Sequence, residues 1–311
     1  MKFKKPKFWD YKTLNMFAYL LLPFSKILQL IIIFKFKKKI KFNGIKTICL
    51  GNFYLGGTGK TSLAIKIKEI LERDKLKVCF IKKFYYWQKD EQILLSKRGK
   101  TFVEKNRINA IKKAILENYD VAIFDDGAQD HSIDYDLIFI CFNNLNWIGN
   151  GLTLPAGPLR EKIDNLKYYD NVFLNGNDEN LYNIKDKIKK INEKINIHVS
   201  KYVPLNINEF KKNEKFLVFS GIGNHRTFVN MLKDHNIDII KDIEFPDHFN
   251  YSDNDLDEIL NWSKKLNAKI ITTEKDYLRI DKSKLKTVKY IKSEINILDE
   301  NKFINTLKCL K

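Results

Sequence analysis

The segment from Gly56 to Thr61 has the residue types and spacing of a phosphate-binding loop. It reads Gly-Gly-Thr-Gly-Lys-Thr, follows the apolar run Ile45–Leu50 and precedes the helix-like segment Ser62–Arg73. In such a loop the backbone N–H groups and the N-terminus of the helix bind phosphate oxygens. Lys60 would reach the β- and γ-phosphates, and the hydroxyl of Thr61 would help to hold Mg²⁺. The predicted nucleoside triphosphate site consists of Gly56, Gly57, Thr58, Gly59, Lys60 and Thr61.

One position departs from the usual phosphate-loop pattern. That pattern has a glycine five residues before Gly59, where this chain has Tyr54. A glycine-rich turn with a surface lysine is the alternative interpretation. The flanking strand and helix favour the phosphate loop, because they lie where such a loop requires them.

Two acids follow a second apolar run, Val121–Phe124. They are Asp125 and Asp126, and Gly127 comes next. A carboxylate at the end of a buried strand can hold the Mg²⁺ that bridges the phosphates of a bound nucleotide. Acids that cap a helix are the alternative, but the phosphate loop favours a metal. We therefore predict that Asp125 and Asp126, with Thr61, lie on the metal side of the site.

Asp90, Glu91 and His248 could take part in acid–base chemistry. The two acids lie in the sequence KDE, and the histidine ends the sequence FPDH. Each segment by itself is typical of a surface turn, and a lone histidine is usually structural. A phosphoryl transferase needs a group that accepts the proton of the acceptor hydroxyl, and an aspartate with a histidine is a suitable pair. A loop from a second domain could supply one member of the pair on closure.

A loop dense in glycine and proline runs from Gly149 to Glu161. It contains Asn150 and Arg160, and the latter is one of only six arginines in the chain. Glycine and proline give such a loop a defined shape, and a planar guanidinium suits a phosphate or a carboxylate. A rigid turn with a solvated arginine is the alternative.

Strand-like and helix-like segments alternate after the phosphate loop. Strand-like runs are Lys77–Ile81, Val121–Phe124 and Leu137–Cys141, and Lys105–Asn118 has helical spacing of its apolar residues. The alternation predicts an α/β fold like that of phosphate-loop NTPases, with a doubly wound, mostly parallel sheet. Such sheets bind ligands at the C-terminal ends of their strands.

A second, smaller α/β portion is expected towards the C-terminus. The polar stretch Asn175–Glu193 separates it from the first, and its strand-like runs are Lys215–Phe219 and Lys269–Thr273. We predict three parts. They are residues 1–42, a membrane-associated N-terminal helix; residues 43–205, the phosphate-loop core; and residues 206–311, a domain that closes over the site.

The composition fits a globular protein with a basic surface. The chain has 311 residues, of which 44% are hydrophobic, and a net charge of +18. Of its 56 basic residues only six are arginine. A nucleic-acid groove would use arginine more often, whereas surplus lysine suits an anionic membrane surface. The four cysteines have no metal-ligand spacing, which favours reduced thiols in the cytosol.

The N-terminal segment Met16–Phe34 is almost wholly apolar. Pro23 and Lys26 interrupt it, and lysines crowd both of its ends. It is too long for a signal peptide, and no small-residue cleavage site follows. A spanning helix usually has unequal numbers of basic residues at its two flanks, whereas here the flanks are balanced. We expect a helix in the membrane surface with lysines at the headgroups; a spanning helix and a soluble core or partner helix are the alternatives.

Taken in chain order, these segments resemble the lipid A 4'-kinase (tetraacyldisaccharide 4'-kinase) family. The matching pieces, between residues 51 and 276, are GNFYLGGTGKT, KDEQILLSKRG, DDGAQD, GNGLTLPAGPLRE, FSGIGNH, FPDHFNY and TTEKD. The resemblance implies that the γ-phosphoryl group of ATP, with Mg²⁺, is transferred to the 4'-hydroxyl of a tetraacylated glucosamine disaccharide 1-phosphate. It also implies attachment to the cytoplasmic face of the bacterial inner membrane through the apolar helix, with no nucleic-acid partner.

The resemblance further implies three classes of functional residue. The catalytic residues are Asp90, its partner His248, and Lys60. The residues on the metal side are Thr61, Asp125, Asp126 and Glu91. The residues that contact the phosphate or headgroup of the substrate are Arg160, Asn150 and Gln129.

Two segments depart from the family pattern. Family members carry Ser-Arg-Gly-Tyr-Gly after the second strand, where this chain has Lys82–Tyr86. The role of that arginine could pass only to Lys83, which lacks a bidentate fork. The family's histidine after the glutamine of DDGxQH is Asp130 here, with His131 one place later. We expect these departures to alter contacts with the nucleotide or headgroup, and to leave the fold unchanged.

Two other classes of function are compatible with a phosphate loop. A membrane-docked GTPase-like switch or metallochaperone would need Asn/Thr-Lys-x-Asp after a late strand, and Thr273–Asp276 has its lysine one place too late. A basic nucleic-acid-binding ATPase would bind DNA or RNA with steep salt dependence, but arginine is scarce. The lipid kinase is the favoured prediction, and the oligomeric state is left open.

Overall fold

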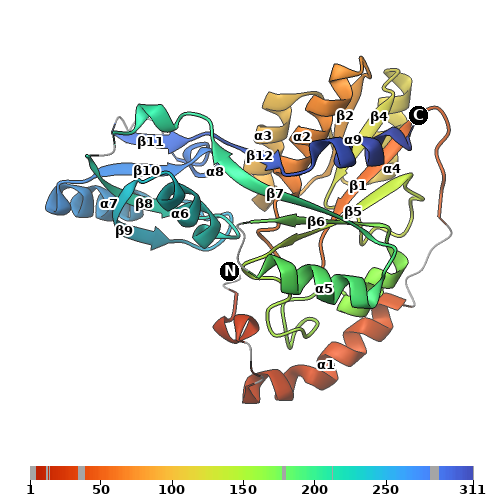
Figure 1. Cartoon of the computed structure of the whole chain (residues 1–311), viewed down its shortest axis with the longest axis horizontal. Helices are drawn as coiled ribbons and strands as arrows, with labels where there is room; N and C mark the ends of the chain where they lie inside the picture. The colour runs from red at the N-terminus through yellow and green to blue at the C-terminus, as the bar shows by residue number, and fades with distance from the viewer. Residues whose placement is uncertain are drawn as a thin grey trace. The chain divides into compact units, whose positions relative to one another are not determined.

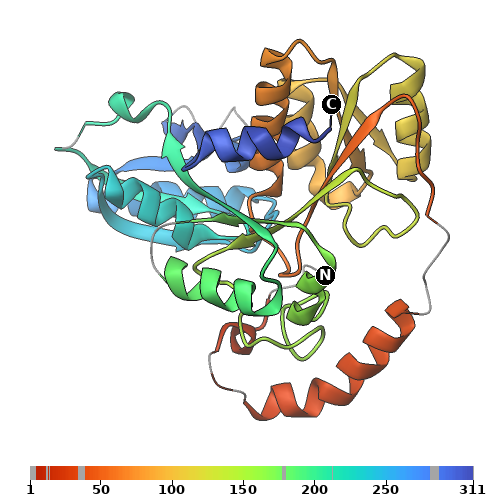
Figure 2. The same cartoon turned by 45° about the vertical axis from the view of Figure 1, so that its right-hand side comes forward.

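The structure is a computed structural model of the chain, and it describes residues 5–11, 13, 15–33, 39–176, 180–211, 213–280 and 287–310. These residues form two compact units (Figures 1 and 2). The larger unit contains residues 5–85, 95–201 and 297–310, and the smaller unit contains residues 86–94 and 202–296. Each unit is described by itself.

The larger unit is built on an eight-stranded sheet with the order β12-β7-β6-β5-β1-β4-β2-β3 (Figure 1). Its strands are β1 (Lys46–Gly51), β2 (Val78–Lys83), β3 (Thr101–Glu104), β4 (Val121–Asp125), β5 (Leu137–Asn143), β6 (Asn171–Asn175), β7 (Asn196–Pro204) and β12 (Ser293–Ile297). The end of β7 from residue 202 and the part of β12 up to residue 296 belong to the residues grouped with the smaller unit. From β3 to β7 every neighbouring pair is parallel. This confirms the predicted mostly parallel α/β sheet.

Helices cover both faces of this sheet. The helical segments of the larger unit are η1 (Lys7–Asp10), α1 (Met16–Ile33), α2 (Lys60–Arg73), α4 (Arg107–Leu116), η3 (Ile163–Tyr168), α5 (Leu181–Ile191) and α9 (Glu300–Lys308). On one face α2 packs against β1, β2 and β4, and Phe303 of α9 contacts Phe139 and Phe173. The opposite face carries α4 and α5, each over its own hydrophobic cluster.

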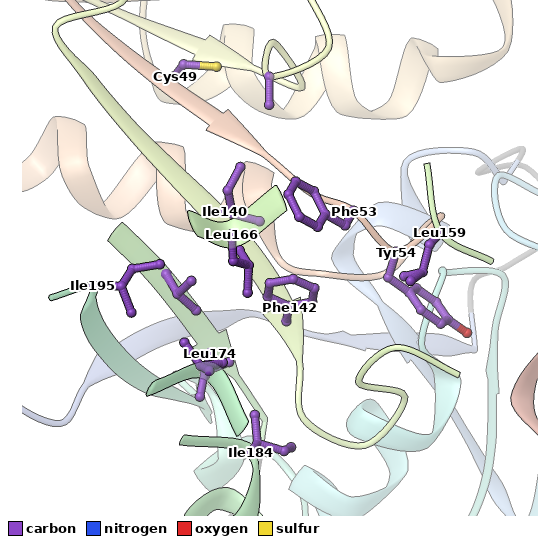
Figure 3. Packing of buried hydrophobic residues seen from close by; sticks show 13 residues of the cluster. Cys49, Phe53, Tyr54, Ile140, Phe142, Leu159, Leu166, Leu174, Ile184 and Ile195 are labelled. Atoms are coloured by element: carbon purple, nitrogen blue, oxygen red, sulfur yellow. The ribbon is translucent and has the colours of Figure 1, made fainter. Parts of the chain in front are cut away.

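The cluster beneath α5 reaches the chain that leads into the phosphate loop. Buried side chains of β5 and β6 pack there against Ile184 and Ile188 of α5. Figure 3 shows Phe53 next to Phe142 in this cluster, and Tyr54 next to Leu159. The segment that enters the phosphate loop is therefore anchored in the hydrophobic core.

Helix α5 lies inside the stretch Asn175–Glu193, which the sequence analysis interprets as a polar separator. It begins at Leu181 and ends at Ile191. Polar residues dominate the stretch, but Ile184 and Ile188 are spaced by one helical turn and are buried. Such a narrow apolar stripe suffices for a helix that lies against only one face of a sheet.

In both views helix α1 lies apart from the eight-stranded sheet, at the bottom of the picture and below α5 (Figures 1 and 2). It begins at Met16, as expected, and contains Pro23. Within the ranges that the structure describes, no helix has the length and apolar character needed to cross a membrane.

The smaller unit contains a parallel four-stranded sheet with the order β11-β10-β8-β9. Its strands are β8 (Lys215–Ser220), β9 (Asp238–Glu244), β10 (Lys269–Thr273) and β11 (Val288–Ile291). Its helical segments are η2 (Tyr86–Gln88), the first part of α3 (Lys89–Arg98), η4 (Ile207–Glu209), α6 (His225–Asp234), α7 (Asp253–Leu266) and α8 (Glu274–Tyr277). Because side chains alternate along β8, Val218 packs with α6 and Phe219 with α7 on the opposite face.

The compact units do not follow the order of the chain. The chain enters the smaller unit at Tyr202, close to the expected boundary at residue 205, but residues 86–94 also pack with that unit. Residues 297–310 return to the larger unit. The division into domains 43–205 and 206–311, with a helix in 1–42, stays a prediction.

Candidate active site

The predicted site residues fall into two groups, one in each compact unit. The larger unit holds the phosphate loop, the two acids at the end of β4 and the loop 149–161. The smaller unit holds Asp90, Glu91 and His248.

The phosphate loop takes its shape from glycine. Gly56, Gly57 and Gly59 have φ angles of 86°, 51° and 84°. A residue with a Cβ atom is strained in this left-handed region, whereas glycine is not. Gly59 is the N-cap of α2, which begins at Lys60, two residues earlier than the sequence predicts. The positive end of the helix dipole and its first N–H groups therefore lie at Lys60 and Thr61, as an anion site requires.

Tyr54, which replaces the expected glycine, has a structural role. Only 1% of its surface is exposed. Its hydroxyl donates a hydrogen bond to Asp10 over 2.6 Å and accepts one from Nζ of Lys5 over 2.7 Å. Tyr54 thus joins the entry of the phosphate loop to residues 5–10, and the left-handed turn begins only at Gly56.

Asp125 lies at the C-terminal end of β4 beside the first turn of α2. Its Oδ2 accepts hydrogen bonds from Nζ of Lys82 (2.8 Å) and Oγ1 of Thr61 (3.2 Å). Its Oδ1 is buried and has no hydrogen-bond partner within the described part of the chain. A carboxylate and a hydroxyl are oxygen ligands that Mg²⁺ prefers. Asp125 and Thr61 therefore fit a magnesium ion, with Oδ1 as the open position.

Among the described residues, this region included, no three histidine, cysteine or acidic side chains gather into a metal-binding group. A magnesium ion on a nucleotide does not need such a group, because phosphate oxygens and water supply most of its ligands.

Asp126 is held by two cations. Nη1 and Nη2 of Arg160 lie 2.7 and 3.3 Å from its carboxylate oxygens, and Nζ of Lys60 lies 3.7 Å away. Burial alone would raise the pKa of Asp126, but the charges of Lys60 and Arg160 hold it below its usual value. Asp126 has a φ of 63°, and such strained residues cluster at functional sites. Its carboxylate links the phosphate loop to the loop 149–161.

The two other residues predicted to contact substrate help to shape this region. Gln129 accepts a hydrogen bond from Arg160 (2.9 Å) and donates to the backbone of Asn52 and to Glu161. Both ends of the Asn150 side chain bond within its own loop, to Ala156 O and Leu152 N. Their contacts with a substrate stay predictions.

The departures from the family pattern also have partners within the fold. Asp130 forms an ion pair with Arg107 of α4 over 3.0 Å, and Arg107 also donates to the backbone carbonyl of Asp126. Nζ of Lys83 lies 5.5 Å from the centroid of the Tyr85 ring. Arg107 was not among the predicted site residues, because an arginine that starts a helix carries no motif.

In the smaller unit, His248 and Asp90 form a hydrogen-bonded pair. Nδ1 of His248 donates to the two carboxylate oxygens of Asp90 over 2.9 and 3.1 Å. His248 has a φ of 55°, and its own N–H donates to the carbonyl of Gly221 at the end of β8. The structure thus brings together two residues that are 158 positions apart.

The pair shifts the pKa of both members. Burial raises the pKa of Asp90, but the hydrogen bond and charge of His248 outweigh it and lower that pKa overall. Burial lowers the pKa of His248, but the bond to Asp90 and the nearby acids raise it overall. An ionised aspartate beside a protonated histidine is therefore the favoured state.

Two residues that the sequence analysis missed hold this pair in place. Arg279 donates to the carbonyl oxygens of Gly221 (2.8 Å) and Phe249 (3.1 Å), and its Nε lies 3.8 Å from Asp90. Asp276 is fully buried and accepts hydrogen bonds from Arg279 and from the N–H of Gly221. An acid in the short helix α8, directly after β10, and an arginine in the turn that follows were the available signal.

Glu91, predicted on the metal side, forms an ion pair with Lys275 over 3.2 Å. Lys275 belongs to Thr273–Asp276, the segment that partly resembles a guanine-binding motif. In this structure the segment's lysine and aspartate contact other side chains of the smaller unit, namely Glu91, Tyr251 and Arg279.

Comparison with known proteins gives a consistent result. Residues 17–89 and 88–310 match the model of the family tetraacyldisaccharide-1-P 4'-kinase. A tetraacyldisaccharide 4'-kinase of Pelagibacter ubique is 61% identical over 307 residues, which cover 99% of this chain and 98% of that protein. One from Rickettsia bellii is 31% identical over 308 residues, 91% of each chain.

A solved structure is similar over almost the whole chain. LpxK from Aquifex aeolicus, in complex with ATP, superposes with a TM-score of 0.69 over 95% of this chain and 99% of its own. The two sequences are 22% identical, so this likeness concerns the fold.

Proposed function

The chain belongs to the tetraacyldisaccharide-1-phosphate 4'-kinase family, and on that premise we propose how its residues carry out the transfer. It is an ATP-dependent lipid kinase of lipid A biosynthesis. In the reaction, the bond between the β-phosphate and the γ-phosphorus of ATP breaks, and a phosphate ester forms at the 4'-hydroxyl. ADP leaves, and the hydroxyl proton passes to a base.

The proposed phosphate side consists of the phosphate loop and the residues around Asp125. Loop N–H groups and Lys60 would neutralise charge on the phosphates as the bond breaks. Thr61 and Asp125 would hold Mg²⁺, which when bound would supply positive charge against the developing charge on the phosphates. The unpartnered Oδ1 of Asp125 is the single observation that best supports this assignment. Asp126 is proposed to act beside them on the metal side.

Asp90 is proposed to accept the proton of the 4'-hydroxyl. It is ionised because its pKa is lowered, and His248 orients it through a bond to both carboxylate oxygens. A positioned base of this kind contributes about 10²- to 10⁴-fold to a rate. Glu91 is proposed to act on the metal side, with Lys275 as its counter-ion.

Arg160 and Asn150 of the loop 149–161, together with Gln129, which bonds to Arg160, are proposed to contact the lipid substrate. The N-terminal segment supports this loop directly. Oγ of the buried Ser25 donates to Thr153 O (2.9 Å) and accepts from Ala156 N (3.0 Å).

Helix α1 is proposed to lie in the cytoplasmic surface of the inner membrane. Around the buried residues Ala18 and Ser25, large apolar side chains of the helix are exposed. The exposed ones are Met16, Phe17, Tyr19, Leu20, Phe24, Ile27, Leu28, Leu30 and Ile31. Such a face stabilises a helix that lies in the interface between headgroups and acyl chains. The acceptor lipid would then be presented next to the loop that α1 supports.

Vesicle flotation tests the membrane proposal. We expect Phe24→Glu with Ile27→Glu to reduce binding to anionic vesicles by on the order of tenfold or more, because each change places a charge at the acyl boundary. Leu116→Glu, a change of another exposed apolar residue on α4, is the matched control. Equal binding of all three proteins would refute a role for α1.

The transfer itself is tested by incubating the purified protein with Mg-ATP and tetraacylated disaccharide 1-phosphate. Mass spectrometry should show a gain of one phosphoryl group on the sugar that carries the 4'-hydroxyl. No gain at saturating enzyme would refute the function, and a product phosphorylated elsewhere would refute the assigned position.

A further inference from the structure

A buried lysine, Lys82, lies in the predicted metal site. It belongs to the segment Lys82–Tyr86, which departs from the family pattern, and it has no role in the predictions made from the sequence. It is the fifth residue of β2 and is in register with Asp125 of β4, so both side chains point to the face covered by α2. Only 1% of the surface of each residue is exposed. Nζ of Lys82 donates to Oδ2 of Asp125 over 2.8 Å.

An ion pair at this depth needs a reason other than stability. Removing two charges from water costs as much as their attraction returns, and an apolar pair of similar volume is often as stable or more so. The residues of β2 before Lys82 are apolar, and an apolar residue would continue that pattern. The pair therefore indicates a functional role at the end of β4.

The two oxygens of Asp125 have different surroundings. Oδ2 accepts from Lys82 and Thr61, whereas Oδ1 is buried without a hydrogen-bond partner among the described residues. A carboxylate held on one side by an ammonium presents its other oxygen in a fixed direction. Lys82 thus orients the oxygen that would face the metal.

The charges around this site favour a cation only when phosphate is present. Two carboxylates, Asp125 and Asp126, are paired with three cationic side chains, Lys60, Lys82 and Arg160. A divalent cation alone meets a surplus of positive charge, and the negative charge of a bound triphosphate reverses that balance.

We propose that Lys82 is a built-in counter-ion of the metal site, which neutralises Asp125 so that a divalent cation binds only together with the nucleotide. Lys82 is a positioning residue in this role, because it acts through Asp125. The inference rests on the proposed function of Asp125 as a metal ligand.

Binding of Mn²⁺, followed by electron paramagnetic resonance without nucleotide, tests the proposal. In Lys82→Met we expect Mn²⁺ to bind on the order of tenfold more tightly than in the unchanged protein, because a positive charge next to the ligand is lost. Lys82→Arg, which keeps the charge, should bind as the unchanged protein does. Lys46→Met loses an equal charge at an exposed residue of β1 and is the control, which should bind Mn²⁺ as the unchanged protein does.

A second variant tests whether the carboxylate of Asp125 causes any gain in Mn²⁺ affinity. Adding Asp125→Asn to Lys82→Met should abolish the gain, and a gain that persists would overturn the proposal. Thermal melting gives an independent readout: Mn²⁺ should raise the melting temperature of Lys82→Met more than that of the unchanged protein. If Mn²⁺ raises the two melting temperatures equally, the ion pair of Lys82 with Asp125 is only structural. Lys82→Gln replaces Lys82→Met if the latter does not fold.

Failure of the underlying assignment has a different signature. Asp125→Asn alone should weaken Mn²⁺ binding in the presence of ATP. Unchanged binding would remove Asp125 as a metal ligand, whatever Lys82 does. Weakened binding together with an unaltered Lys82→Met would refute only the role of Lys82.

Discussion

The phosphate side and the acid–base side are held in place by different means. Around Lys60 the positions of the side chains are set mainly by the backbone, through a glycine turn, a helix N-terminus and the ends of adjacent strands. Around Asp90, side chains from distant segments set the positions: His248 bonds to Asp90, and Arg279 bonds to Asp276 and to the backbone carbonyl of Gly221. The first arrangement is fixed by main-chain geometry, and the second depends on each of its contacts. A change on the phosphate side should therefore remove one chemical function, whereas a change on the acid–base side should also disturb its neighbours.

The largest effect is expected from Lys60→Ala. Loss of the cation that we propose to lie next to the γ-phosphate should lower turnover by on the order of 10²-fold or more, which is several kcal/mol of barrier at ~1.4 kcal/mol per decade. The melting temperature should not change, because the backbone shapes the loop. Single-turnover transfer and thermal melting measure the two quantities, with the exposed Lys46→Ala as control. A large loss of stability would show that side-chain contacts matter here too.

Asp90→Asn should follow, with turnover lowered on the order of 10²-fold at unchanged affinity for ATP. The amide has the same shape but cannot accept the hydroxyl proton. Steady-state kinetics with nucleotide binding measured separately would resolve the two effects. Asp234→Asn, at an exposed acid of the same unit, is the control. Near-normal turnover would remove Asp90 from proton transfer.

Arg160→Lys should have a smaller effect, a loss of about tenfold in kcat/KM for the lipid. Lysine keeps the charge beside Asp126 but not the two-pronged contact with Asp126 and Gln129. Kinetics at varied lipid concentration test this expectation. If KM for ATP rises in place of KM for the lipid, Arg160 belongs to the phosphate side alone.

The acid–base pair should also make stability depend on pH. Because the folded pKa of His248 is raised above its ordinary 6.5, its contribution is full below pH 6.5 and is lost as the pH rises through the folded pKa. The pKa of Asp90 is lowered from 3.8, so its contribution is lost only in acid. Urea denaturation at about pH 6 and about pH 9 should therefore show a larger stability difference between the unchanged protein and His248→Asn at the lower pH. An equal difference at both would contradict the charged pair.

The smallest effect is expected from Ser25→Val, which removes the two hydrogen bonds between α1 and the loop 149–161. We expect kcat/KM for the lipid to fall a few-fold, by about 1 kcal/mol for a buried hydrogen bond, and KM for ATP to stay unchanged. Assays on mixed lipid and detergent micelles measure both, and Ser293→Val, at an exposed serine, is the control. A rise in KM for ATP alone would show that α1 supports the phosphate loop and not the lipid side.

The sequence by itself determined the phosphate loop and the sheet around it. Three glycines, a lysine and a threonine between an apolar run and a helix specify one local backbone, because φ preferences and the start of a helix act over a few residues. The apolar runs likewise predicted β1, β4 and β10 to within a residue or two, since burial on both faces of a parallel strand leaves a continuous apolar signal.

Only the tertiary structure decided which charged residues meet. Lys82 joins Asp125 because β2 and β4 are neighbours in the sheet, although 43 positions separate the two residues. Asp90 joins His248 because residues 86–94 pack with the smaller unit. A surface turn and a buried ion pair can have the same local sequence, and they differ only in what the rest of the chain places beside them. For this reason the backbone of the phosphate loop could be predicted from its own residues, whereas the pairing of Lys82 with Asp125 could not.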